Sequence, residues 1–208
     1  MRKAALVTIA TVLVGCTAPN TLNLSTGPIQ DAAPTAGPVI VPTAPARSKL
    51  HNEYALVGPI TMGEAIYVVN WLSHTPSPTI VIHSPGGSME GSMLIMDAVE
   101  VNGSVTCIVD GLAASGAFGI VQACKHRFMT AQSKLMTHAV KAGISGELDQ
   151  QDLEKALMEM VPATQIWNER CRARLRMSRA DYLEHVTGKD WFMDAAEAIA
   201  VNAIDGVI

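Results

Sequence analysis

The sequence predicts an α/β domain in which parallel strands are joined by crossover helices. β-branched runs such as 79–83 and 105–109 alternate with helical segments such as 61–73 and 91–99. A parallel strand pair needs a crossover, usually a helix, so this alternation favours parallel pairing. Hydrophobic residues make up 49% of the chain and charged residues 16%, which is enough apolar material for a substantial core.

The first predicted elements have clear start and stop signals. A strand at 54–57 ends at a Gly-Pro pair, and the helix at 61–73 has apolar residues at helical spacing. Thr61 is its expected N-cap, and Glu64 three residues later completes a capping box. The strand at 79–83 is stopped by the sequence Ser-Pro-Gly-Gly.

The middle of the chain continues the alternation. The strand at 105–109 is followed by a helix of small residues at 113–123 and by short strands at 127–130 and 134–137. A long helical region at 146–175 carries an apolar stripe, and Pro162 inside it predicts a kink.

The C-terminal part ends in a second capped helix. Asp194 followed by Glu197 predicts another N-terminal capping box, and the chain finishes with a short apolar segment at 204–208. Asn202 follows the helix at a place suited to a left-handed cap.

The N-terminus predicts an export signal. A basic pair is followed by a mainly apolar stretch at 4–14, which is too short to span a bilayer but suits a signal peptide. It ends in Leu-Val-Gly-Cys, which resembles a bacterial lipobox with Cys16 as the lipidated residue. Thr17 follows it where an Asp would retain the protein at the inner membrane, so we expect a lipid anchor at the outer membrane, on the periplasmic side.

Three segments are therefore expected. Residues 1–16 are the lipoprotein signal peptide, residues 17–49 a disordered tether, and residues 50–208 the folded domain. The tether is rich in Pro, Ala and Thr and almost uncharged, so it lacks the apolar surface that would offset the entropy of ordering.

Charge and motifs exclude several classes of function. The net charge is −4, whereas binding to nucleic acid needs a basic surface. The chain has neither a metal-binding spacing such as C-x-x-C nor a phosphate-binding glycine loop, so we expect no metal and no cofactor.

Two strand ends carry candidate chemistry. Gly86 and Gly87 follow the strand at 79–83, where glycine allows close approach to the backbone and the N–H groups could face a carbonyl oxygen. Ser115 follows the strand at 105–109 in the first turn of a helix, where the helix dipole favours a developing negative charge. A plain turn and a close-packed small-residue helix are the structural alternatives.

A nucleophilic serine needs a base and a residue that orients the base. His138 closes the strand at 134–137, where a strand end would project it into a cleft. His83 is a competitor because it lies beside the glycine pair. The pattern of residues alone leaves this choice open.

Residues 79–208 resemble the proteolytic subunit family of Clp protease, which has the ClpP/crotonase fold. The resemblance rests on four blocks in order: Ile82 to Gly87 with Gly91 and Asp97, Gly111 to Ala117, Lys134 to His138, and Asp190 to Ala198 with the closing segment 204–208. It implies repeated β-β-α units, a protruding helical handle, a homo-oligomer and a peptide or unfolded-protein substrate.

The resemblance also implies the site. Ser115 is the nucleophile, His138 the general base and Asp190 the residue that orients it, while the N–H groups of Gly87 and Gly116 form the oxyanion hole. Asp194 and Asp181 are acidic neighbours better explained as helix-start residues. The implied enzyme is a serine peptidase.

The sequence departs from the family at several positions. Gly116 stands where the family usually has Met, Ala139 and Val140 replace Gln-Pro, and Asn202 replaces Gly. The N-terminal axial loop has no counterpart, because the tether occupies that place. An exported protein meets neither ATP nor a cytosolic unfoldase, so we expect peptidase activity without an ATPase partner.

Three other functions remain possible from the sequence. A Ser-Lys peptidase resembling the signal-peptide peptidase family would use Lys134 or Lys141 as base. A crotonase-type acyl-CoA enzyme would use the oxyanion hole alone. A catalytically inactive, membrane-tethered binding protein would keep only the scaffold.

The remaining cysteines are expected to be free. Cys107, Cys124 and Cys171 lie in apolar surroundings, where a buried thiol is the usual state, although an exported protein permits a disulfide.

Overall fold

The computed structural model describes residues 52–141 and 149–208. The expected signal peptide, Cys16 and the tether at 17–49 lie outside the described residues. No helix within these two ranges combines the length and the apolarity needed to cross a bilayer.

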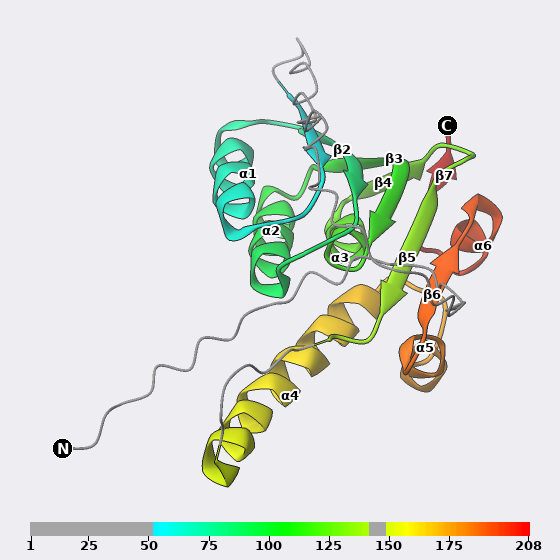
Figure 1. Ribbon diagram of the computed structural model, residues 1–208. Coiled ribbons are helices and arrows are strands. Elements are labelled where there is room, and N and C mark those ends of the chain that lie inside the picture. The colour runs from blue at the N-terminus through cyan, green and yellow to red at the C-terminus, as the bar shows by residue number, and fades with distance from the viewer. Residues whose placement is uncertain (1–51, 142–148) are drawn as a thin grey trace, which may run out of the picture.

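A seven-stranded sheet forms the centre of the described part of the chain (Figure 1). Its strands are β1 (Glu53–Val57), β2 (Thr79–Ser84), β3 (Thr106–Ala114), β4 (His126–Met129), β5 (Lys134–His138), β6 (Asp190–Met193) and β7 (Gly206–Val207). The main path runs β1-β2-β3-β4-β7 and every pair along it is parallel. β5 pairs in parallel with β3 and antiparallel with β6.

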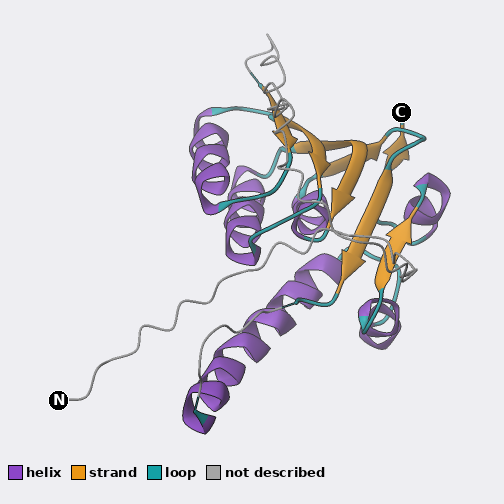
Figure 2. Ribbon diagram, viewed as in Figure 1, coloured by secondary structure: helices purple, strands orange, loops and turns teal. Residues whose placement is uncertain are grey.

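The helices alternate with these strands and confirm the expected α/β class. They are α1 (Met62–His74), α2 (Met89–Asn102), α3 (Gly116–Ala123), α4 (Gln150–Arg172), α5 (Arg179–Val186) and α6 (Ala195–Ala200). Figure 2 shows α1, α2 and α3 together on one face of the sheet. The alternation runs strand–helix through α3, and β4, β5 and α4 then form a β-β-α unit.

β3 is the strand that positions the candidate site, because it has different neighbours along its length. Its residues 106–109 pair with β4, and its residues 112–114 pair with β5. Gly111 lies between the two halves with φ +102°, a conformation that favours glycine. The far end of β3 is thereby placed beside β5, where α3 begins.

The start of α3 differs from the sequence prediction. A helix was expected over 113–123 and a strand over 105–109 only, but Ala113 and Ala114 belong to β3. Their backbones pair with Leu135 and Met136 of β5. Alanine prefers a helix, but strand pairing with a buried neighbour overrides that local preference.

Most of the predicted helix caps are confirmed. The Asp194 side chain accepts a hydrogen bond from the Glu197 N–H and caps α6, but the reciprocal half of that predicted box is absent among the described contacts, where the Glu197 carboxylate accepts from Trp191. Asn202 has φ +61° after the helix. The Thr61 side chain accepts a hydrogen bond from the Glu64 N–H and caps α1. The reciprocal half of that capping box is absent among the described contacts, because the Glu64 carboxylate accepts a hydrogen bond from the Tyr54 hydroxyl.

α4 is the protruding helix that was expected, and it extends away from the body of the molecule (Figure 1). It ends at Arg172, three residues before the predicted end at 175, and it continues as one helix through Pro162; the predicted start at 146–148 lies outside the described residues. Its C-terminal half packs on α3, where Trp167 leaves no room for a side chain at Gly119. Its N-terminal half exposes large apolar side chains, namely Leu153, Leu157, Met158 and Val161.

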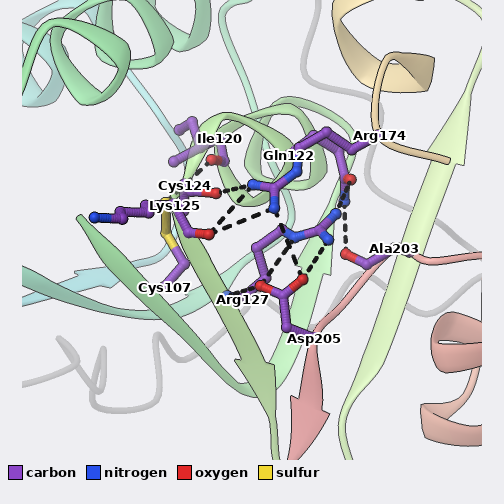
Figure 3. The surroundings of a disulfide bond; sticks show 9 residues. All are labelled: Cys107, Ile120, Gln122, Cys124, Lys125, Arg127, Arg174, Ala203 and Asp205. Carbon is purple, nitrogen blue, oxygen red and sulfur yellow. Dashed lines mark hydrogen bonds and ion pairs between the residues drawn. A yellow bond between two sulfur atoms is a disulfide. The ribbon is translucent and has the colours of Figure 1, made fainter. Parts of the chain in front are cut away.

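The expectation of free cysteines was wrong for two of the three. Cys107 of β3 and Cys124, at the end of α3, form a disulfide with a Cα–Cα distance of 5.9 Å (Figure 3). Cys171 is free and buried. The two partners are 17 residues apart in sequence, and they meet because α3 returns along β3 after the turn at Ser115.

Candidate active site

Ser115 lies at the junction between β3 and α3 in an unusual backbone conformation. It is the N-cap residue of α3, with φ +51° and ψ −115°. A residue with a side chain rarely adopts positive φ, and such strain is found most often at functional sites. The Ser115 N–H donates to the Met136 carbonyl of β5 at 2.8 Å, which holds the turn against the neighbouring strand.

The glycine loop after β2 packs directly against this turn. A Cβ atom on Gly86 would lie 2.5 Å from the Ala114 carbonyl oxygen, 2.7 Å from the Gly116 nitrogen and 2.8 Å from the Ser115 Cβ. Gly86 also has φ +88°. Only glycine fits at this position, because both the backbone angle and the space exclude a side chain.

The two predicted oxyanion donors are brought together. The Gly87 nitrogen is 3.5 Å from the position that a Cβ on Gly116 would take. Within the described residues, neither of these two N–H groups donates a hydrogen bond, whereas the Ser115 N–H is already used. Two unpaired N–H groups beside a serine at a helix N-terminus are the donors that an oxyanion requires.

Ser92 of α2 packs against Gly116 and was not singled out from the sequence. It is fully buried, and its hydroxyl donates to the Ser88 carbonyl at 2.7 Å. A Cβ on Gly116 would lie 2.2 Å from the Ser92 Oγ. Ser92 therefore explains why glycine follows the serine in this chain, although its sequence context gave no signal.

His138 ends β5, two residues beyond the Met136 that binds Ser115. The His138 Nδ1 lies 2.6 Å from the Ala139 carbonyl oxygen, which only accepts hydrogen bonds. Nδ1 therefore carries the proton in the neutral ring, and Nε2 keeps the lone pair that a general base needs.

Asp190 begins β6 directly opposite His138 in the antiparallel ladder. Its carboxylate contacts the Lys141 ammonium, with Nζ 3.3 Å from Oδ1. Within residues 52–141 and 149–208, no hydrogen bond joins Asp190 to His138 or His138 to Ser115. The fold thus places the predicted base and the predicted acid as strand neighbours, while the side chain of each makes another contact.

The competing residues lie elsewhere. His83 is exposed, its Nδ1 is 2.8 Å from the Asp110 carbonyl oxygen, and its ring covers Gly111. Gly111 is four strand residues before Ser115, which corresponds to about 13 Å. Lys134 begins β5 at the end opposite to His138, so its backbone is also about 13 Å from that residue.

The acidic residues near Asp190 have the structural roles predicted for them. Asp181 forms a capping box with Ser178 at the start of α5. Hydrogen bonding to Ser178 lowers the pKa of Asp181, and hydrogen bonding to the Glu197 N–H lowers the pKa of Asp194.

A cavity lies beside Asp190. It has a volume of about 370 Å³, and its lining includes Val140, Lys141, Lys189 and Asp190. Its walls combine short apolar side chains with two lysines and the Asp190 carboxylate.

A buried polar contact supports β5 from its other face. The hydroxyl groups of Thr137 and Tyr182 are 3.1 Å apart, and Tyr182 also interacts with Cys171. Burial raises the pKa of the Cys171 thiol to about 12, so the thiol stays protonated and is a poor nucleophile. Burial also raises the pKa of Tyr182.

A comparison of the sequence with models of protein families identifies the family of this chain. The model of the Clp protease family matches residues 62–208, which is more than two thirds of the chain. The match covers the glycine loop, the β3–α3 junction, β5 and β6. Members of this family act on peptide substrates and typically form oligomers. With this match and this α/β fold, the chain belongs to the Clp protease family.

Proposed function

We propose that this chain is a serine endopeptidase that cleaves unfolded polypeptides or short peptides without ATP. The observation that carries the proposal is the strained Ser115 beside the unpaired N–H groups of Gly87 and Gly116. Ser115 acts as nucleophile, His138 as general base and Asp190 as the residue that orients the imidazole.

In the acylation step, the Ser115 Oγ attacks the scissile carbonyl carbon while the His138 Nε2 takes its proton. The negative charge that develops on the carbonyl oxygen is stabilised by the N–H groups of Gly87 and Gly116. Removing one such donor typically lowers kcat by about 10²–10³-fold. The protonated imidazole then gives its proton to the leaving amine, and an ester to Ser115 remains.

In the deacylation step, water attacks that ester and His138 again accepts and returns the proton. Asp190 stabilises the imidazolium in both steps once its carboxylate faces Nδ1. That contact requires the imidazole to turn from the Ala139 carbonyl and the carboxylate to leave Lys141. The cross-strand position of His138 and Asp190 supports this rearrangement, because only side chains have to move.

Lys141 supports a second candidate mechanism. Its ammonium is close to Asp190, so it lies in the same region as His138. A Ser-Lys peptidase would use Lys141 as the base and would tolerate replacement of His138. The first mechanism is preferred because the imidazole already has the tautomer of a base.

The proposed location of the enzyme is the cell envelope. We infer that the chain is exported, lipidated at Cys16 and held at the periplasmic side of the outer membrane by the tether at 17–49. Neither ATP nor a cytosolic unfoldase is present there, which is why the activity is proposed to be ATP-independent. The apolar face of α4 supports assembly with further copies of the chain.

The test is covalent labelling of the purified full-length protein with a fluorophosphonate probe. Labelling is compared between the wild type and the variants Ser115→Ala, His138→Ala, Asp190→Asn and Lys141→Met, each checked for folding by circular dichroism. We expect no labelling without Ser115 and at least a hundredfold slower labelling without His138, as for loss of a general base.

Two outcomes would change the proposal. Labelling that depends on Ser115 but survives in His138→Ala, and is lost in Lys141→Met, would establish the Ser-Lys mechanism. Absence of labelling in a folded, assembled wild type would show that the protein is not a serine peptidase and would favour the inactive binding protein.

A further inference from the structure

We propose that the Cys107–Cys124 disulfide is a permanent brace of the element that carries Ser115, formed when the protein folds in an oxidising compartment. The bond joins β3 to the end of α3 and closes a ring of chain (Figure 3). Ser115 lies near the middle of that ring, 8 residues after Cys107 and 9 before Cys124. The strand, the turn and the helix of the candidate nucleophile therefore form one covalently closed unit.

The surroundings of the bond support a structural role. Both cysteines have 0% exposed surface. A reductant must bring a thiolate into line with a disulfide sulfur, so a buried bond reacts only when the structure opens. A regulatory disulfide has to be reached by its reductant, whereas this one is buried.

Charged side chains fix the same end of the unit. The Arg174 guanidinium donates to the Cys124 carbonyl, and the fully buried Arg127 donates to the Gln122 side chain of α3 at 3.1 Å. Arg127 also binds Asp205, so the end of α3 is tied to the C-terminal segment (Figure 3). Because these contacts already hold the C-terminal end of α3 in the folded state, the disulfide stabilises the protein mainly by restricting the conformations of the unfolded chain.

Oxidation of the two thiols to a disulfide requires an oxidising compartment. Forming the bond releases two protons and two electrons from the two thiols, and a protein or small-molecule disulfide accepts them and becomes two thiols. The cytosol keeps thiols reduced, whereas the periplasm keeps disulfides oxidised. The brace is therefore expected in exported molecules and not in molecules retained in the cytosol.

The first test measures the redox state of each cysteine in the full-length protein recovered from cell envelopes. Free thiols are alkylated in denaturant, disulfides are then reduced, and the new thiols receive a second, heavier label before mass spectrometry. We expect Cys107 and Cys124 to carry the second label and Cys171 the first. The first label on Cys107 and Cys124 in envelope protein would overturn the proposal.

The second test compares thermal unfolding with and without a reductant. A loop of this length predicts a loss in Tm of roughly 6–12 °C when the disulfide is removed. Reductant present during heating should lower the wild-type Tm by that amount and leave the double variant Cys107→Ala/Cys124→Ala unchanged. The control Cys171→Ala, which also removes a buried thiol, should respond to the reductant as the wild type does.

A third measurement separates a brace from a switch. At 25 °C the native protein should keep the disulfide in reductant for hours, and the bond should become reducible only in denaturant. Complete reduction of the native protein within minutes would contradict the proposal. None of these readouts uses catalysis, so they stand or fall separately from the proposed peptidase activity.

Discussion

At the scale of single residues, the conformation of Ser115 depends on glycines that have no room for a side chain. Gly86 packs against the Ser115 turn, and Gly116 packs against the Ser92 hydroxyl. Positive φ at Ser115 persists because these close contacts and the bond to Met136 leave no alternative backbone path.

The contact between Gly116 and Ser92 gives a stability prediction. Gly116→Ala should lower the free energy of unfolding by about 1–3 kcal/mol, because the new methyl group overpacks a buried site. In the double variant with Ser92→Ala, the combined loss should be smaller than the sum of the two single losses, with a coupling of at least about 0.5 kcal/mol. Urea denaturation of the two single variants and the double variant measures this coupling free energy.

Gly63→Ala is the matched control for this cycle. Gly63 lies on α1, and its nearest neighbour to an added Cβ is at 3.8 Å. Alanine there should leave the stability unchanged or raise it by up to about 1 kcal/mol, through helix propensity. Strictly additive losses for Gly116→Ala and Ser92→Ala would mean that the two residues do not compete for space.

The contact between Lys141 and Asp190 gives a prediction on reactivity. Lys141→Met should free the carboxylate for His138 and raise the rate of Ser115 labelling about two- to fivefold, which is the range of an exposed ion pair. Lys141 is 57% exposed, so a larger gain is not expected. Single-turnover labelling with a fluorophosphonate probe measures the rate.

Lys189→Met is the charge-matched control. Lys189 lines the same cavity, but among the described residues it forms no ion pair with Asp190. Its replacement should change the labelling rate by less than a factor of two. Equal rates in wild type and Lys141→Met would contradict a competition for Asp190.

At the scale of elements, the C-terminal segment is held to β4 by the ion pair between the buried Arg127 and the partly exposed Asp205, which Arg174 also approaches at 3.8 Å. Arg127 is 1% exposed and binds the Asp205 carboxylate, the Asn202 carbonyl and the Gln122 side chain. Burial opposes ionisation of Asp205, but the hydrogen bonds and charge of Arg127 outweigh it and hold the pKa of that carboxyl below its usual value.

This shift predicts a pH dependence of stability. Because the folded-state pKa of Asp205 is lower than the unfolded value, the contribution is complete above about pH 5 and is lost as the pH falls through the folded pKa. At pH 7, Asp205→Asn should lower the free energy of unfolding by about 1–3 kcal/mol, because the buried Arg127 guanidinium loses its carboxylate partner while solvent reaches part of the site. Below about pH 3, the difference from wild type should shrink.

Denaturation in urea at pH 7 and at pH 3 measures both values. Asp110→Asn is the control, because Asp110 is an exposed carboxylate without an ion pair among the described residues. It should leave the stability within about 0.5 kcal/mol of wild type at both pH values. An Asp205→Asn loss that is the same at both pH values would show that the charge of Asp205 is not responsible.

At the scale of the whole molecule, α4 projects from the body with an apolar face that nothing in the described chain covers. Leu153, Leu157 and Val161 recur every four residues and are 43–49% exposed. Side chains at this spacing form one stripe along a helix. A stripe of this kind on a protruding helix is typical of a subunit contact.

Replacing one apolar side chain in this stripe should weaken assembly. Leu157→Glu should shift the protein to smaller species, because burying an unpaired carboxylate in an apolar interface is strongly unfavourable. Multi-angle light scattering after size exclusion measures the mass. The control Lys155→Glu changes an exposed residue two positions away and should keep the wild-type mass, while an unchanged mass in Leu157→Glu would place the contact elsewhere.

Much of the fold is determined locally and was predictable. The strand–helix alternation, the cap at Thr61 and the caps at Ser178 and Asp194 depend on residues within a few positions of one another. The order of the glycine loop, the Ser115 turn, β5 and β6 likewise indicated the family before any contact was known.

The tertiary structure decided the features that join distant residues. It extended β3 to Ala114 through pairing with β5, and it joined Cys107 to Cys124. It also placed the Lys141 ammonium beside the Asp190 carboxylate, where the sequence predicted the His138 ring. Sequence spacing does not report distances between segments, so none of these contacts could be read from it. The sequence by itself determined the order and type of most elements and which residues could react, because these follow from local patterns. Only the packing of those elements decided which side chains meet, because that depends on the whole sheet.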